Sequence, residues 1–186
     1  MTAAADILEE HGYQGVTIEG IARRSGAAKT TIYRWWDSKA ELVMDAYTHT
    51  VAQRMPEPDT GSVRDDLVAY TAELYDVVNH PLRVRALRGL MAEAQLDPGF
   101  ERPFRAWVAT RRQVVAAILG RGRDRGELRP DLDLEHAVDL LFGPYWYRLL
   151  VGHLPLDPRE AERHIDQILN GLRAPLGQLA PETDAG

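Results

Sequence analysis

Residues 17–42 read TIEGIARRSGAAKTTIYRWWDSKAEL, and this stretch decides the fold. Thr17 can cap a first short helix whose isoleucines face inward, because a threonine hydroxyl accepts from the free N–H groups of a first turn. Gly26 ends that helix, since glycine adopts the positive φ that a tight turn often requires. A second short helix follows over residues 29–35. Two such helices around a tight turn form a helix-turn-helix, and the second one has the size to enter the major groove of DNA.

Helical periodicity continues on both sides of this stretch. Ser38 and Glu41 have the spacing of a capping box, which begins the next helix. Apolar residues then recur at three- and four-residue spacing, and no segment alternates for long enough to predict a strand. The sequence therefore predicts an all-α protein of about nine helices, with an N-terminal three-helix helix-turn-helix domain and a larger C-terminal helical domain.

Two prolines and a glycine separate these two parts. Residues 55–61 read MPEPDTG, which cannot continue a helix because proline lacks an N–H group and clashes with the preceding turn. We interpret this segment as the linker. The expected domains are residues 1–47, which contain the helix-turn-helix, and residues 48–186, which form the larger helical domain.

Composition excludes several classes of site. The 186 residues include no cysteine, so disulfides, thiolate metal sites and cysteine nucleophiles are ruled out. The histidines lack the spacing of a metal motif, and no catalytic constellation or glycine-rich phosphate loop is visible. We therefore expect no enzymatic activity, no metal and no cofactor. No apolar run approaches the ~20 residues of a membrane helix and no signal peptide is visible, so we expect a cytoplasmic protein without a membrane partner.

Charge is distributed unevenly along the chain. The net charge is −6, yet residues 17–40 contain five basic residues against two acidic ones, a local charge of +3. Positive charge on a helix-turn-helix favours contact with DNA phosphates. The same pattern also fits a solvated helix face, so charge alone leaves both interpretations open.

A resemblance to a known family adds to this interpretation. It rests on five segments in register: ILEEHGY (7–13), TIEGIA (17–22), SG (25–26), KTTIY (29–33) and SKAEL (38–42). These segments resemble the N-terminal domain of the TetR/AcrR family of bacterial transcription regulators. The segment from GELRPD at 126–131 to GPY at 143–145 resembles the C-terminal domain of one TetR subgroup.

The resemblance implies a function. It implies a homodimer that binds a double-stranded DNA operator, with a C-terminal domain for ligand binding and dimerisation. The expected protein is thus a sequence-specific transcription regulator, a repressor that a small-molecule effector releases from a palindromic operator. The alternatives are a helical small-molecule-binding protein without specific DNA binding and a protein that binds DNA of any sequence.

The resemblance also implies which residues contact DNA. Thr30 is expected at base edges, Thr31 at the DNA backbone and Lys39 at a phosphate. The expected DNA-binding residues are Thr17, Lys29, Thr30, Thr31, Tyr33, Arg34, Trp35 and Lys39. Ala28 departs from the family pattern, because a serine that caps the recognition helix is common at this position. We therefore expect packing to stabilise this helix in place of a cap.

Aromatic residues are numerous in the C-terminal part, where they either line a ligand cavity or form the core. The residues expected at a cavity are Tyr70, Phe104, Trp107, Arg111, Phe142 and Trp146. A partly aromatic or aliphatic small molecule is the expected ligand. Arg111, His136 and Arg148 are candidate partners for an anionic group on it, or alternatively face solvent.

The last two helices, expected over residues 134–151 and 158–172, are the predicted dimer interface. The residues expected there are Tyr145, Leu149, Ile165, Ile168, Leu169 and Leu172. Ile165, Ile168, Leu169 and Leu172 make an apolar stripe on the last helix. Such a stripe can equally close the core of a single chain, so the sequence leaves this alternative open.

Overall fold

Helices form all the regular structure in the computed structural model, which describes residues 1–52 and 57–170. They are α1 (Thr2–Gly15), α2 (Ile18–Ser25), α3 (Lys29–Trp35), α4 (Lys39–Ala52), α5 (Val63–Val77), α6 (Pro81–Leu96), α7 (Pro98–Asp124), α8 (Leu134–Val151), the 3-10 helix η1 (Pro158–Glu160) and α9 (Ala161–Asn170). The all-α prediction is confirmed, with nine α-helices among the described residues. Residues 55 and 56 of the expected linker lie outside the described part.

The first three helices form a small head. Thr17 caps α2, since its Oγ1 accepts from the N–H of Gly20 at 3.0 Å. Gly26 ends α2 with a φ of 71°, as the tight turn requires. Ala28 precedes α3 and makes no side-chain capping hydrogen bond, so α3 is stabilised by packing, through the buried Ile32. The head therefore follows the local signals of its sequence closely.

The helix α4 connects the head to the rest of the molecule. It begins at a cap in which the N–H of Glu41 donates to Ser38 Oγ at 3.1 Å. The carboxylate of Glu41 accepts from the N–H of Asp37, one residue before the position that a reciprocal capping box uses. α4 packs on α1 in the head and on α7 beyond it. The boundary that we expected between residues 47 and 48 thus falls inside a continuous helix.

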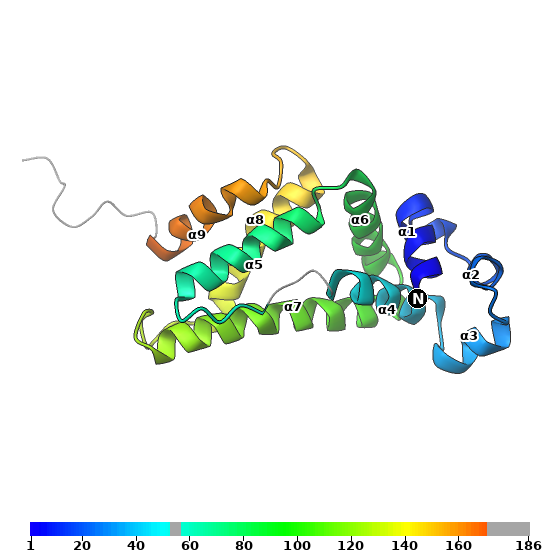
Figure 1. Ribbon diagram of the computed structural model, residues 1–186, viewed down its shortest axis with the longest axis horizontal. Coiled ribbons are helices and arrows are strands. Elements are labelled where there is room, and N and C mark those ends of the chain that lie inside the picture. The colour runs from blue at the N-terminus through cyan, green and yellow to red at the C-terminus, as the bar shows by residue number, and fades with distance from the viewer. Residues whose placement is uncertain (53–56, 171–186) are drawn as a thin grey trace, which may run out of the picture.

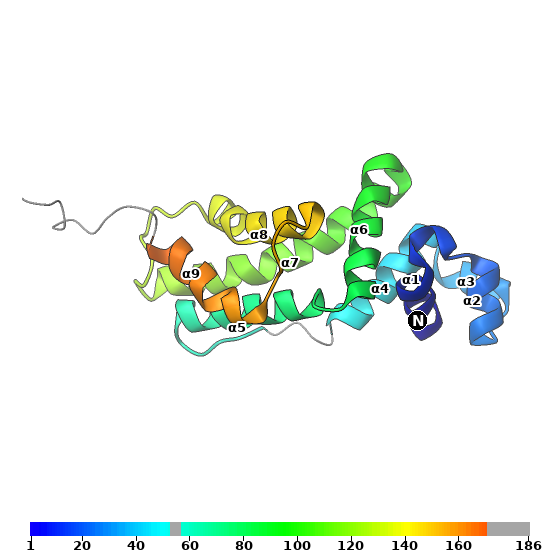
Figure 2. The same cartoon turned by 90° about the horizontal axis from the view of Figure 1, so that it is seen from above.

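The remaining helices form an elongated body around α7. α7 packs against α4, α5, α6 and α8, while α9 packs on α5 (Figure 1). The view from above shows α7 between α5 and α8 (Figure 2). The helices α2 and α3 lie at one end of the molecule and α9 toward the other, so the head projects from the body. Large apolar side chains that are fully buried include Leu67, Tyr75, Leu87, Phe100, Ile118 and Ile165.

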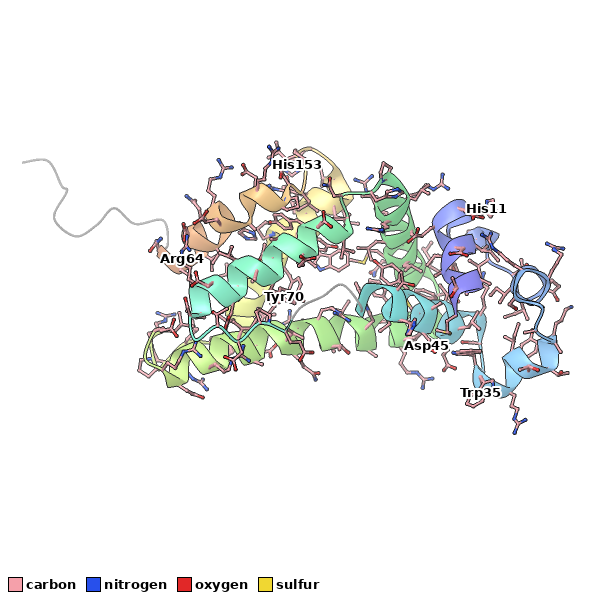
Figure 3. The ribbon with its side chains drawn as sticks, in the orientation of Figure 1. His11, Trp35, Asp45, Arg64, Tyr70 and His153 are labelled. Carbon is pink, nitrogen blue, oxygen red and sulfur yellow. The ribbon has the colours of Figure 1, made fainter. Side chains whose placement is uncertain are left out.

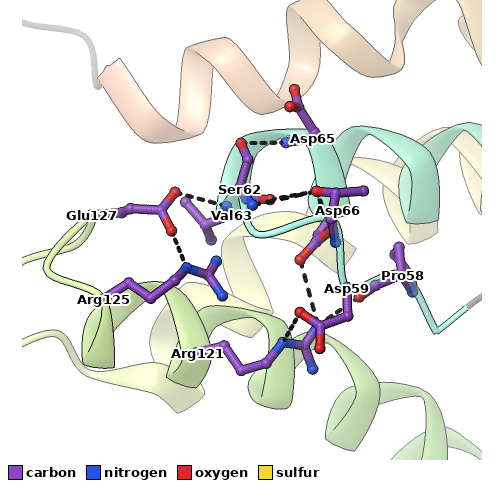
Figure 4. A network of polar contacts seen from close by, with 10 residues as sticks. Pro58, Asp59, Ser62, Val63, Asp65, Asp66, Arg121, Arg125 and Glu127 are labelled. Carbon is purple, nitrogen blue, oxygen red and sulfur yellow. Dashed lines mark hydrogen bonds and ion pairs between the residues drawn. The ribbon is translucent and has the colours of Figure 1, made fainter.

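A polar network fixes the start of α5 against α7 (Figure 4). The Asp66 carboxylate is fully buried and accepts from both the N–H and the hydroxyl of Thr60 at 2.7 Å. Arg121 on α7 contacts the same carboxylate at 3.5 Å. The N–H of Val63 donates to Glu127 at 2.8 Å, which satisfies a donor at the helix start. The body therefore holds the beginning of α5 at a defined place.

The described part of the chain contains no candidate membrane span. None of its helices combines the length and the apolar character needed to cross a bilayer.

Candidate functional site

The outer surface of α3 is exposed along its whole length. The exposed side chains are Lys29, Thr30, Thr31, Tyr33, Arg34 and Trp35. Tyr33 is 56% exposed and Trp35 is 72% exposed, and Trp35 projects from the head in Figure 3. Ile32 points the other way and is buried. One face of α3 thus holds the helix on the head, while the other presents hydroxyl, aromatic and cationic groups at the end of the molecule.

Two arginines on the head have no carboxylate partner among the described residues. Arg34 on α3 and Arg23 on α2 are both exposed and form no ion pair there. By contrast, Arg24 pairs with Glu10 at 2.7 Å, and Lys29 pairs with Glu19. Sequence reasoning missed Arg23 as a site residue, although its place on the side of α2 away from the inward isoleucines predicts exposure.

Thr17 and Lys39 flank this surface. Thr17 is exposed, but its hydroxyl oxygen already caps α2. Lys39 is half-buried, with its Nζ 3.9 Å from the centre of the Tyr13 ring and 3.4 Å from the Tyr13 carbonyl oxygen. This contact uses one of the three ammonium N–H donors, so two remain for a phosphate. All eight residues expected at DNA lie in the head or at the start of α4.

A cavity of about 250 Å³ lies among α4, α5, α7 and α8. Four of the six residues that we expected at a cavity line it, namely Trp107, Arg111, Phe142 and Trp146. The other lining residues are Tyr47, Leu74, Val77, Val108, Arg112, Asp139, Gly143 and Tyr145. An apolar cavity of ~150 Å³ is enough to bind benzene, so this one has the size of a small ligand.

Tyr70 and Phe104, also expected at the cavity, do not line it. Tyr70 is fully buried on α5 (labelled in Figure 3), where its ring meets Phe142 edge-on and its hydroxyl donates to the Arg111 carbonyl oxygen at 3.4 Å. Phe104 packs on Trp107 with ring centres 5.6 Å apart. Both residues pack against side chains that line the cavity, Tyr70 against Phe142 and Phe104 against Trp107.

Two of the three candidate partners for an anionic group are also outside the cavity. His136 is exposed at the start of α8. Arg148 donates from Nη1 to the Pro155 carbonyl oxygen at 3.3 Å. Arg111 alone of the three lines the cavity.

Three of the residues expected at a dimer interface belong to the core of the single chain. Tyr145, Leu149 and Ile165 are 2%, 2% and 0% exposed. Tyr145 stacks on Tyr75 of α5, and α9, which carries Ile165, packs on the same helix. This corrects the expectation for these three residues. Ile168 and Leu169 are half-buried, and Leu172 lies outside the described residues.

The helix α8 exposes a different apolar stripe, formed by Leu140, Tyr147 and Val151. Their side chains are 49%, 60% and 59% exposed. They are seven and four residues apart, and with 3.6 residues per turn this spacing places them on one face of the helix. Leu154, just after α8, is exposed as well. Exposed apolar side chains on one helix face make α8 a candidate contact surface.

Comparisons with known proteins agree with this geometry. Residues 1–46 match the model of the bacterial regulatory proteins of the tetR family. Residues 57–168 match the model of the tetracyclin repressor-like C-terminal domain. These matched residues make up more than half of the chain. The chain belongs to the TetR family.

Several TetR-family relatives resemble it over most of their length. The helix-turn-helix regulator YdeS of Bacillus subtilis is 37% identical over 81% of this chain and 76% of its own. The DNA-binding repressor TetR of Mycobacteroides abscessus is 30% identical over 91% and 89%. The crystal structure of the TetR-family regulator SCO0332 superimposes with a TM-score of 0.81, at 35% identity, over 92% of this chain and 95% of its own. The protein is therefore a helix-turn-helix transcription regulator.

Proposed function

We propose that this TetR-family regulator binds a palindromic operator as a homodimer, represses transcription there, and is released when a small molecule enters the cavity of the body. The observation that carries the proposal is the exposed face of α3, because its hydroxyl and aromatic groups and Arg34, which has no carboxylate partner among the described residues, lie at the free end of the head. Helices that read DNA present such groups to base edges and phosphates.

The side chains of the head divide into two roles. Thr30, near the start of α3, reaches base edges in the major groove, and Thr31 contacts the DNA backbone. Arg34 and Arg23 bind phosphates, because neither cation is neutralised by a carboxylate among the described residues. Tyr33 adds a hydroxyl donor to a phosphate. Base contacts give specificity, while phosphate contacts give affinity and position.

A second copy of the chain covers the stripe on α8. One head contacts too little DNA for tight specific binding, so two heads related by a two-fold axis read two half-sites. Leu140, Tyr147 and Val151 supply the apolar part of the interface, and Ile168 and Leu169 of α9 extend it. The stripe lies on α8, away from α2 and α3, so pairing there leaves both heads accessible (Figure 1).

The helix α4 couples the cavity to DNA. Tyr47 lines the cavity and meets Trp107 edge-on at 5.5 Å, while Lys39 begins the same helix beneath the head. Eight residues of helix span about 12 Å, and a helix of this length moves as a rod. A ligand that displaces Tyr47 therefore shifts the head. A coupling of about 1–3 kcal/mol, usual for allostery, is enough to weaken operator binding 5- to 150-fold.

Selection from a random DNA pool tests the proposal. The purified protein should enrich one inverted repeat, because a two-fold dimer reads the same half-site twice. Enrichment of DNA without a shared sequence indicates non-specific binding, and no enrichment indicates a small-molecule-binding protein without operator recognition. Either of these results contradicts the proposed function.

A further inference from the structure

The cavity contains an arginine that lacks a counterion. Arg111 is 9% exposed and lines the cavity. Its Nε is buried without a hydrogen-bond partner, and its side chain forms no ion pair with any described residue. A buried cation without a partner is unfavourable by several kcal/mol unless another group supplies the opposite charge. Something absent from the chain itself is therefore expected to complete this site.

The neighbouring arginine in the same wall, Arg112, does have carboxylate partners. Arg112 pairs with Asp139 and, at 2.7 Å, with Glu135. Asp139 is the one carboxylate among the described residues that line the cavity, and one of its oxygens pairs with Arg112 and none with Arg111. The positive charge of Arg111 consequently remains unbalanced.

Three further hydrogen-bond donors at the cavity also lack partners among the described residues. Trp107 Nε1 is buried without a partner. The hydroxyls of Tyr47 and Tyr145 form no hydrogen bond with the described residues, and burial raises the pKa of both phenols, so they stay protonated at neutral pH. The Arg111 Nε, the Trp107 indole N–H and two phenol hydroxyls at the cavity thus have no hydrogen-bond partner among the described residues. The matching ligand carries acceptor oxygens.

The rest of the wall is apolar. Leu74, Val77, Val108 and Phe142 face the space together with the ring of Trp146. A cavity of ~150 Å³ is enough to bind benzene, and this one has about 250 Å³. One aromatic ring with a short chain, or one medium-length alkyl chain, fills the cavity when a carboxylate is attached.

We propose that the effector is an apolar monocarboxylate whose carboxylate binds Arg111, with its alkyl or aryl body against the apolar wall. A carboxylate matches the planar fork of a guanidinium through two parallel hydrogen bonds. One unpaired cation balances a single negative charge, which favours a carboxylate over a phosphate dianion. This inference rests on the proposed function, since it assigns the effector to the cavity described above.

Binding of matched acids and amides to the full chain without DNA tests the inference. The probes are octanoate and 3-phenylpropionate, each compared by calorimetry with its neutral amide. We expect the acids to bind about tenfold more tightly or better, the gain of one charge-assisted pair. In Arg111→Met the preference for the acid should vanish, because the cation is gone. In Arg111→Lys part of the preference should survive, because the charge remains while the fork is lost.

The matched control is Arg105→Met, on the same helix. Arg105 is largely exposed and pairs with Glu101, so this change should leave the acid preference unaltered. Equal binding of acid and amide, or a preference that persists in Arg111→Met, overturns the inference. Operator release is measured separately: acids that bind through Arg111 without releasing operator refute the proposed function but not the site. Release by the amides but not by the acids refutes the ligand class but not the regulator.

Discussion

At the scale of single residues, the head contains two kinds of cation: those that pair with a carboxylate of the same chain, and those that face solvent without such a partner among the described residues. Arg24 is held by Glu10, whereas Arg34 is exposed without a carboxylate partner among the described residues. Hydrogen bonding to Arg24, the main cause, lowers the pKa of Glu10, so this pair stays charged at neutral pH. Only a cation that is not already paired within the chain gains from a phosphate without losing an internal contact.

Arg34→Ala should therefore weaken binding to every DNA sequence. Loss of one phosphate contact releases about one counterion fewer, so the slope of log affinity against log salt should fall in magnitude by about 1. Fluorescence anisotropy over a salt series measures this slope. The control is Arg105→Ala on α7, where the arginine already pairs with Glu101, and this change should leave the slope unchanged. An unaltered slope in Arg34→Ala contradicts the phosphate assignment.

At the scale of elements, Asp66 holds the start of α5 to α7. Burial alone would raise the pKa of Asp66, but hydrogen bonds from Thr60 and Arg121 outweigh it and lower the pKa below its ordinary value. A carboxyl whose pKa is lower in the folded state stabilises the fold above its unfolded pKa. This contribution is lost as the pH falls through the folded pKa.

Asp66→Asn should thus lower the melting temperature at pH 7 and flatten its decline toward acid pH. The amide presents an N–H group where Arg121 needs an acceptor, so the buried contact is lost. The neighbouring Asp65→Asn serves as control, because the Asp65 side chain is mostly exposed. Calorimetry from pH 7 to about pH 3 covers the range where carboxyls titrate. Identical curves for the two variants contradict this role of Asp66.

The elements also show what the sequence could predict. Helix starts were predictable because a cap such as Thr17 or Ser38 binds the backbone of the turn that directly follows it. Which element covers an apolar helix face was not predictable. The stripe through Ile165 has the same spacing whether α5 or a second chain covers it. Tyr47 was missed at the cavity for the same reason, since its periodic position predicts burial but not which helices surround it.

At the scale of the whole molecule, the stripe on α8 should decide the oligomeric state. Tyr147→Glu places a charge on an exposed apolar face, so it should yield folded monomer in sedimentation at micromolar concentration. Ile165→Glu should instead unfold the chain, because that side chain is fully buried. Leu96→Glu, at an exposed leucine on α6, is the matched control and should stay dimeric. A dimer that survives Tyr147→Glu and Val151→Glu contradicts this interface.

The spacing of the two half-sites tests the central claim most directly. The measurement is a titration of the selected inverted repeat with its half-sites at the natural separation, and again with five base pairs inserted between them. A two-fold dimer with rigidly held heads predicts tight binding when the half-sites lie about one helical turn apart, ~34–36 Å. Half a turn more places one half-site on the opposite side of the duplex, so binding should fall to the level of a single half-site. Equal affinity for both spacings would contradict a dimeric operator-binding regulator.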